Sequence, residues 1–378
     1  MVKVSVIIPV FNTEKYLNEC LDSVINQTLN DIEIICINDG STDDSLNILE
    51  SYSTKDKRLK IISQPNKGQG AARNVGLKMS KGEYIYFMDS DDILKSETLK
   101  ENYDLCQEKN LDLSMFQLIN YDDEKNEYYQ DHHYNMPTLA ESVKDEIFSY
   151  KDLGETIFHI AVSPVNKLYN KQFLTNLNVK FPEDVLFEDN IFFWNVFLNA
   201  NRILFIQKHY YIRRRHSSSS TGTAGIRFLD TIEVHNRVFD IFKGKKIFNK
   251  FKCNLFNKKI NLVYLRFKQV NSNIKPLFFD KMKKDFQTML NEYGEELFSC
   301  LNNNQKLILN NTIKAKGYEE LILLVENEKL ELSNKKWNYK NKKIIKNIKN
   351  TKNENHSILN SNSWKITKPL RFIKKFIK

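Results

Sequence analysis

An alternation of apolar strands with amphipathic helices over the first 90 residues constrains the fold most. Residues 4–10 are β-branched and continuously apolar, as expected for a strand buried on both faces. Residues 14–28 then place apolar side chains at helical spacing. The pattern repeats, with strands expected at 32–37, 59–63 and 83–88 and helices at 43–52 and 69–79. It predicts an α/β fold with a mainly parallel central sheet flanked by helices on both faces.

Unusual polar residues collect where these strands end. Pro9 to Asn12 follow the first strand, Asn38 to Ser41 the second, and Asp89 to Asp92 the fourth. Ligands of open parallel sheets bind at the carboxyl ends of the strands. We therefore expect the functional site at this edge of the sheet.

Each of these turns has a functional and a structural interpretation. The carboxylates from Asp89 to Asp92 repel one another unless a cation joins them, which favours a hard divalent metal holding a diphosphate. Ser90 or Asp92 could equally be a helix N-cap. Asp39 could accept a hydrogen bond from a base or ribose, or belong to an ordinary strand-to-helix turn. Residues 66–74 contain two glycines and two cations that suit phosphate, but also a generic loop.

The net charge of +10 belongs to one end of the chain. Residues 335–378 carry 14 basic residues against a single acid, Glu354, so the remainder is slightly acidic. This distribution argues against a nucleic-acid-binding role for the whole protein.

The cysteines and the hydropathy pattern bear on the compartment. There are five cysteines, an odd number, with no close-spaced pair of the kind that builds zinc or redox sites: Cys20, Cys36, Cys106, Cys253 and Cys300. The N-terminal apolar run is too short for a signal peptide, and no stretch approaches the ~20 apolar residues of a membrane span. We expect a cytoplasmic protein that works at a membrane, if at all, from one side.

The composition changes along the rest of the chain. Residues 121–146 are polar, acidic and rich in Tyr and His, which predicts an exposed excursion or flexible loop. From about residue 226 the pattern is helical and rich in Lys and Asn. We expect a catalytic domain at 1–225, a helical region at 226–334 and a basic tail at 335–378.

Taken together, the ordered strand-end motifs resemble those of family 2 glycosyltransferases with the GT-A fold. The motifs are Pro9 to Asn12, Asn38 to Asp43, Asn66 to Asn74 and Asp89 to Asp92; the resemblance is close to about residue 115 and looser to about 220. It implies an inverting, metal-dependent hexosyl- or N-acetylhexosaminyl-transferase of cell-surface polysaccharide synthesis. The donor would be a nucleotide sugar, most often a UDP-sugar in this family, and the acceptor a glycan or a lipid-linked glycan.

The resemblance also implies a role for each matched position. Asp39 would contact the nucleobase, Asp89 would hold the ribose or the metal's shell, and Asp91 would ligate Mg²⁺ or Mn²⁺, a Lewis acid for the departing diphosphate. Asp189 resembles the family's general base, with Glu188 as a positioning residue, although an acidic pair also favours a helix start. The nucleotide-sugar-binding positions would be Pro9, Val10, Phe11, Asp39, Arg73, Asp89 and Arg213.

Two further segments have open interpretations. Arg213 lies in a run of three arginines that could close over the donor diphosphate or form a solvated surface, and His216 is expected to be exposed rather than a ligand. Residues 361–371 resemble a C-terminal segment of surface-polysaccharide glycosyltransferases. Continued as a helix from Pro369, the tail would be basic and amphipathic and could bind an anionic membrane, or be a solvated extension.

Two other functions are alternatives that the sequence leaves open. One is a nucleotidyltransferase built on a related sheet, which the Glu188 and Asp189 pair and the Arg213 segment disfavour. The other is a non-catalytic scaffold that binds membrane or nucleic acid through its basic tail. The presence of Asp39, Asp91 and Asp189 favours an active enzyme.

Overall fold

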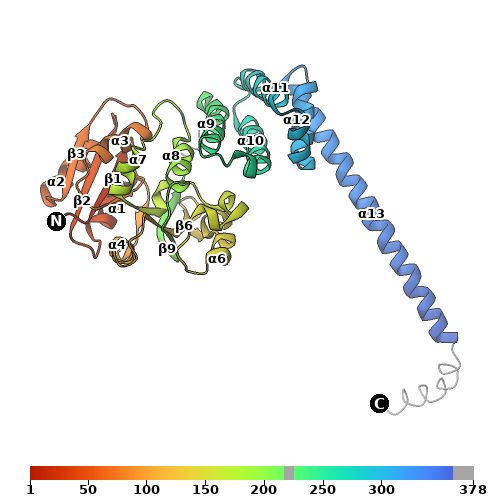
Figure 1. Cartoon of the computed structure of the whole chain (residues 1–378), viewed down its shortest axis with the longest axis horizontal. Helices are drawn as coiled ribbons and strands as arrows, with labels where there is room; N and C mark the ends of the chain where they lie inside the picture. Colours follow the sequence, from red (N-terminus) through yellow and green to blue (C-terminus); the bar gives the residue numbers. More distant parts are fainter. Residues whose placement is uncertain (217–224, 361–378) are drawn as a thin grey trace, which may run out of the picture. The chain divides into compact units, whose positions relative to one another are not determined.

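The computed structural model describes residues 1–216 and 225–360. The chain divides into two compact units, Met1–Gln305 and Lys306–Lys378. The first unit contains the sheet and the helices labelled up to α11 in Figure 1.

The predicted alternation is confirmed, with small changes at the element ends. Strands β1 (Val4–Val10), β2 (Ile32–Asn38), β3 (Leu59–Ser63) and β4 (Tyr84–Phe87) pair in parallel in the order β3-β2-β1-β4. The sheet then continues through β8 (Lys167–Asn170), β6 (Leu113–Asp122), β9 (Ile203–Arg215) and β5 (Ile93–Leu94). β8 runs antiparallel to both of its neighbours, whereas β6 and β9 are parallel, so the sheet is mainly parallel.

Helices cover both faces of the parallel half of the sheet, and the side-chain period of two decides which residues they meet. Ile34 and Cys36 of β2 belong to the core that includes Leu17 of α1 (Glu14–Ile25) and Leu49 of α2 (Ser45–Lys55). The intervening Ile35 and Ile37 pack with Ala72 of α3 (Gln69–Met79) on the other face. The continuously apolar strands therefore have the two-sided burial that their sequence predicts.

The segment from residue 121 to 146 is not a flexible excursion. β6 extends to Asp122 and pairs with β7 (Glu127–Tyr129), and the helices α5 (His132–Asn135) and α6 (Pro137–Val143) follow. Met136 and Leu139 are buried, whereas Tyr128 is 59% exposed. Because the segment is mostly polar, its composition did not predict that a few of its apolar residues are buried.

The remaining helices before the helical region lie between strands of the sheet, except η4, which follows β9 and leads into that region. They are α4 (Thr98–Glu108), η1 (Tyr150–Asp152), η2 (Gly154–His159), η3 (Pro164–Asn166), α7 (Lys171–Leu177), α8 (Glu188–Phe197) and η4 (Ile226–Leu229). After η4 come α9 (Asp230–Gly244), α10 (Phe248–Gln269) and α11 (Lys275–Cys300), and α10 packs against both of the others.

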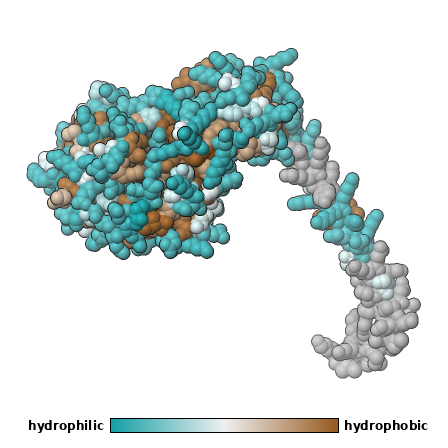
Figure 2. Space-filling view, in the orientation of Figure 1, coloured by the Kyte–Doolittle hydropathy of each residue, from teal (hydrophilic) through white to brown (hydrophobic). Residues whose placement is uncertain are grey.

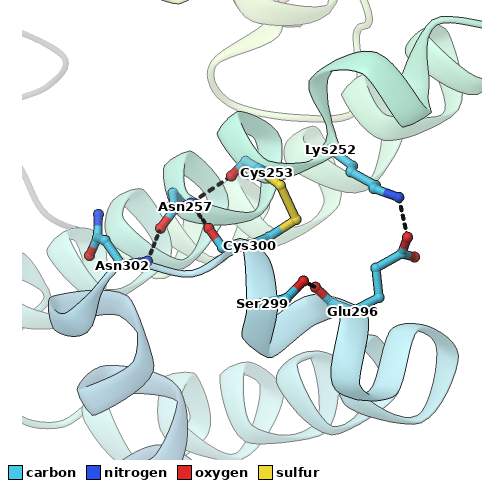
Figure 3. The surroundings of a disulfide bond; sticks show 7 residues. All are labelled: Lys252, Cys253, Asn257, Glu296, Ser299, Cys300 and Asn302. Atoms are coloured by element: carbon cyan, nitrogen blue, oxygen red, sulfur yellow. Dashed lines mark hydrogen bonds and ion pairs between the residues drawn. A yellow bond between two sulfur atoms is a disulfide. The ribbon is translucent and has the colours of Figure 1, made fainter.

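A disulfide between Cys253 and Cys300 joins α10 to the end of α11 (Figure 3). Asn257 binds beside it, because its side-chain amide donates to the carbonyl oxygens of both cysteines. The 47-residue separation gave no sign of this pairing in the sequence. The other three cysteines are buried free thiols.

The second unit contains most of α12 (Asn303–Lys314) and all of the long helix α13 (Tyr318–Asn360). α13 therefore extends through the Lys- and Asn-rich stretch, and its described residues appear mainly hydrophilic in Figure 2. Among the described residues, no helix combines the length and apolarity that crossing a membrane requires. The amphipathic helix expected from Pro369 lies outside the described residues.

Candidate active site

A cavity of about 530 Å³ opens at the carboxyl ends of the parallel strands. All four predicted strand-end motifs contribute to its wall, as the topology of the sheet requires. Residues from after α7 and from β9 onward complete it. The lining includes Pro9 to Thr13, Tyr16, Asp39, Asn66 to Gly70, Asp89 to Asp91, Pro182, Leu186, Glu188, His216 and Arg227.

Asp39 holds the glycine-containing loop in place at one end of this cavity. Its Oδ1 accepts hydrogen bonds from the Gln64 side chain (2.7 Å) and the backbone N–H of Lys67 (2.9 Å), and its Oδ2 accepts from the N–H of Gly68 (2.8 Å). The residue is buried. The turn therefore has a structural role that the sequence left open, at a position that also faces the cavity.

The three carboxylates after β4 have different environments. Asp92 is buried, and it accepts hydrogen bonds from the Tyr211 hydroxyl (2.6 Å) and the backbone N–H of Arg214 (2.7 Å), which tie the turn to β9. Burial, together with the charges of Asp91 and Asp89, holds the pKa of Asp92 well above its usual range. Asp89 and Asp91 have side chains 30% and 24% exposed and line the cavity. Asp92 is the structural member, and the other two are available to a ligand.

His216 is not exposed, contrary to the expectation from sequence. Its side chain is 7% exposed, its Nε2 lies 3.0 Å from Asp91 Oδ2, and its ring packs on Tyr16 with centroids 4.4 Å apart. Polar residues follow His216 in the sequence, which is why its side chain was expected to be exposed. An imidazole nitrogen thus stands beside the carboxylate predicted to bind the metal.

Arg73 joins the strand-end carboxylates to the acidic pair of α8. One guanidinium nitrogen donates to Glu188 Oε1 at 2.7 Å and another to Asp89 Oδ1 at 2.9 Å, and the side chain is 3% exposed. Gly70, in the first turn of α3, lets this helix pack closely against the segment before α8. A Cβ at Gly70 would lie 2.4 Å from the carbonyl oxygen of Pro182. Arg73 thus contacts Asp89 on the wall of the larger cavity without lining that cavity itself.

Glu188 and Asp189 form the first turn of α8, so their sequence does mark a helix start, and both also line a cavity. Phe187, just before them, adopts a left-handed conformation (φ 69°), which is rare for a non-glycine residue. Burial raises the pKa of Asp189 in spite of the nearby Arg73 charge, and it also raises the pKa of Glu188. The described hydrogen bonds of the Asp189 carboxylate involve Oδ1, which accepts from the backbone and side chain of Asn190.

Asp189 lies on a second, smaller cavity of about 160 Å³. This cavity shares Gln69, Asp89, Asp91, Leu186 and Glu188 with the larger one. Its own wall adds Arg73, Asp92, Tyr134, Ser163 to Val165, Phe187, Asp189, Arg213 and Arg214. Arg213 is therefore on the Asp189 side of the shared wall and does not line the larger cavity.

The structure thus brings the predicted site residues into two adjoining cavities. Pro9, Val10, Phe11 and Asp39 line only the larger one, whereas Arg73, Asp189 and Arg213 line only the smaller one. Sequence reasoning missed Tyr134 and Arg227 as wall residues. Neither lies in a recognisable motif, and Tyr134 comes from the segment expected to be an exposed loop.

Comparison with known proteins finds relatives that are similar in sequence and a solved structure that is similar in fold. A family model described as glycosyl transferase family 2 matches residues 5–174. Glycosyltransferase GlyG of Streptococcus pneumoniae is 35% identical over 228 residues, which are 58% of this chain and 73% of GlyG. The cholesterol galactosyltransferase of Borreliella burgdorferi is 29% identical over 304 residues, 79% of this chain and 82% of that protein.

A crystal structure of Staphylococcus aureus TarS residues 1–349 with UDP-GlcNAc has the same fold. It superposes with a TM-score of 0.68 at 24% sequence identity, and the alignment covers 87% of this chain and 92% of that one.

Proposed function

Because the chain belongs to glycosyltransferase family 2, we propose that it is an inverting, metal-dependent enzyme that moves a sugar from a UDP-sugar to a glycan or lipid-linked acceptor. The observation that carries the proposal is the pair of adjoining cavities with a common wall. The larger one, at the strand ends, suits a nucleotide and its diphosphate. The smaller one is lined by Asp189 together with Asp89 and Asp91, which also line the larger one.

The residues present suit a divalent metal. Asp89 and Asp91 are partly exposed carboxylates on the cavity wall, and oxygen ligands of this kind suit Mg²⁺ and Mn²⁺. Within the described residues, no group of three or more His, Cys, Asp or Glu side chains is assembled as a complete site. Two carboxylates together with diphosphate oxygens would hold the ion, and His216 supplies a nitrogen that Mn²⁺ accepts more readily than Mg²⁺. Once bound, the ion would offset negative charge on the departing diphosphate.

Asp189 is the proposed general base. Its carboxylate takes the proton of an acceptor hydroxyl as that oxygen attacks the anomeric carbon and the bond from this carbon to the diphosphate breaks. A single displacement inverts the configuration of that carbon. The raised pKa brings Asp189 closer to the pH at which a carboxylate is an effective base. Glu188 and Asp89, both bound to Arg73, fix the wall between donor and acceptor.

The donor and the acceptor are proposed from the relatives. UDP-GlcNAc is bound in the TarS structure, which supports a UDP-sugar donor. The relatives are named as glycosyltransferases, and one is named for cholesterol, so a lipid-borne acceptor at the membrane surface is compatible with them. We place the enzyme in cell-surface polysaccharide synthesis, acting from the cytoplasmic face of the membrane.

The experiment is a screen of UDP-sugars and GDP-sugars for hydrolysis by the full-length protein with Mn²⁺, with products identified by mass spectrometry. We expect UDP release from one or a few donors, which EDTA abolishes. Transfer of a nucleotidyl group instead of a sugar would favour the nucleotidyltransferase alternative. Absence of both hydrolysis and Mn²⁺-dependent UDP binding would favour the scaffold.

A further inference from the structure

The smaller cavity contains a cation that the proposed chemistry does not use. Arg213 is half-buried on β9, and among the residues that the structure describes its guanidinium has neither a hydrogen bond nor an ion pair. Its guanidinium carbon lies 5.2 Å from the centroid of the Tyr134 ring. The charges of Asp92 and Asp89 favour its ionised form. Neither carboxylate forms a hydrogen bond or ion pair with the guanidinium, so its donors are available to an anionic ligand.

The neighbouring arginines differ in this respect. Arg73 is bound to Glu188 and Asp89, and Arg214 pairs with Asp123 at 2.9 Å and also with Glu19. Both guanidinium groups are therefore neutralised within the protein. Arg213 is available to a ligand because the strand period of two turns it away from the carboxylates that bind Arg214.

The position of Arg213 indicates which substrate brings the anion. The cavity that suits the nucleotide is lined by His216 and Arg227 but not by Arg213. Arg213 shares its cavity with Asp189, the proposed base, which by its chemistry must meet the acceptor hydroxyl. Arg266 of α10 adds positive charge nearby, because its guanidinium lies 4.6 Å from the ring of Phe187, another wall residue.

We propose that Arg213, backed by Tyr134, binds an oxyanion of the acceptor, a phosphate or a carboxylate next to the hydroxyl that Asp189 deprotonates. The inference rests on the proposed function and names the chemical class of its acceptor. The planar guanidinium donates two parallel hydrogen bonds to such a group, and the Tyr134 ring fixes its orientation. Arg213 is thus a specificity residue for the acceptor and does not bind the donor diphosphate.

The test measures binding of three small probes to the full-length protein saturated with UDP and Mn²⁺, by calorimetry. The probes are glycerol 3-phosphate, glycerate and glycerol. We expect one of the two anions to bind more tightly than glycerol by about tenfold or more, the order expected of a charge-assisted hydrogen bond. Whichever anion binds identifies the phosphate or the carboxylate. Equal affinity for all three probes overturns the proposal.

Variants locate the effect. Arg213→Gln should remove the preference for the anion, and Arg213→Lys should keep part of it, with UDP affinity unchanged in both. Lys208→Gln removes a charge from the same strand outside both cavities and should behave as the wild type. If Arg213→Gln binds the anion normally, or loses UDP affinity instead, the proposal is wrong. Failure of the wild type to bind UDP or hydrolyse a donor would instead refute the proposed function itself.

Discussion

Arg73 of α3 and Glu188 of α8, 115 positions apart in the chain, form a buried ion pair with a nitrogen-to-oxygen distance of 2.7 Å. Because Arg73 also binds Asp89, this one side chain links the strand ends of the sheet to the helix that carries the proposed base. One buried side chain therefore joins the two halves of the site.

Replacing Arg73 with Gln should destabilise the protein strongly. The variant leaves Glu188 buried without its partner, which typically costs about 3–5 kcal/mol of unfolding free energy. Urea denaturation measures the loss. As a control, Arg237→Gln breaks an exposed pair with Asp184 and should cost about 1 kcal/mol or less. Equal stability losses in the two variants would contradict a special role for the Arg73 pair.

Replacing Asp91 with Ala should abolish sugar transfer and the metal-dependent part of UDP binding, because the diphosphate charge would no longer be compensated. Calorimetry with UDP, in Mn²⁺ and in EDTA, separates that part from the rest. Asp104→Ala, at an exposed site on α4, is the matched control and should bind as the wild type. Undiminished Mn²⁺-dependent affinity in the Asp91 variant would remove this residue from the metal site.

Replacing Asp189 with Asn should leave UDP and Mn²⁺ binding intact while slowing transfer by about 10²–10⁴-fold, since an amide is nearly isosteric but accepts no proton. Single-turnover kinetics with saturating donor provide the measurement. Transfer near the wild-type rate would move the base elsewhere, with Glu188 the next candidate. The wild-type rate should fall as pH drops through the raised pKa of Asp189, above the range of an exposed aspartate.

The same variant has an expected effect on stability, with a definite sign. A carboxylate whose pKa is higher in the folded than in the unfolded protein lowers stability above that pKa, because ionisation is then easier in the unfolded chain. Asp189→Asn removes this cost and should unfold at a temperature at or above that of the wild type at neutral pH. A clear loss of thermal stability would show that Asp189 also holds the fold together.

The Cys253 to Cys300 disulfide should stabilise the helical region. Closing a loop of this length typically contributes about 2–4 kcal/mol, and both Cys253→Ser and a reductant should remove that contribution. Thermal unfolding with and without dithiothreitol measures it, and the reductant should have no further effect on the variant.

Disulfides are typical of oxidising compartments, so thiol labelling in cells would test the cytoplasmic location expected from sequence. Five labelled thiols after denaturation, rather than the three that a disulfide would leave, would support that location.

Deleting residues 335–378 should leave the fold and UDP affinity intact but weaken binding to anionic vesicles. The strand-end motifs all precede this segment, and several of its lysines, such as Lys342, Lys343 and Lys346, are exposed on α13. Each basic residue near an anionic surface contributes ~1 kcal/mol, and salt should reduce it because exposed charges are screened within ~8 Å. Unchanged vesicle binding after truncation would rule out the membrane role, and unfolding would make the tail structural.

The sequence predicted the parallel half of the sheet and the residues at its edge, because strands buried on both faces produce continuous apolar runs that few other structures require. It did not predict how Arg73 pairs with Glu188, or that Tyr134 approaches Arg213, since those contacts depend on how distant segments pack. His216 and Tyr134 were missed for a related reason. Their sequence neighbours are polar, so the local composition predicted that both side chains would be exposed. In the folded protein, both line a cavity.

The different contacts of neighbouring residues on β9 have a consequence for how acceptor preference could diverge among related enzymes. Tyr211 and Arg214 tie this strand to Asp92 and to Glu19 and Asp123, whereas Arg213 between them contacts Tyr134. A mutation at Arg213 can therefore alter the substrate that is accepted while those ties are retained. Directed evolution that randomises Arg213 and Tyr134 should yield folded libraries in which new acceptor preferences arise.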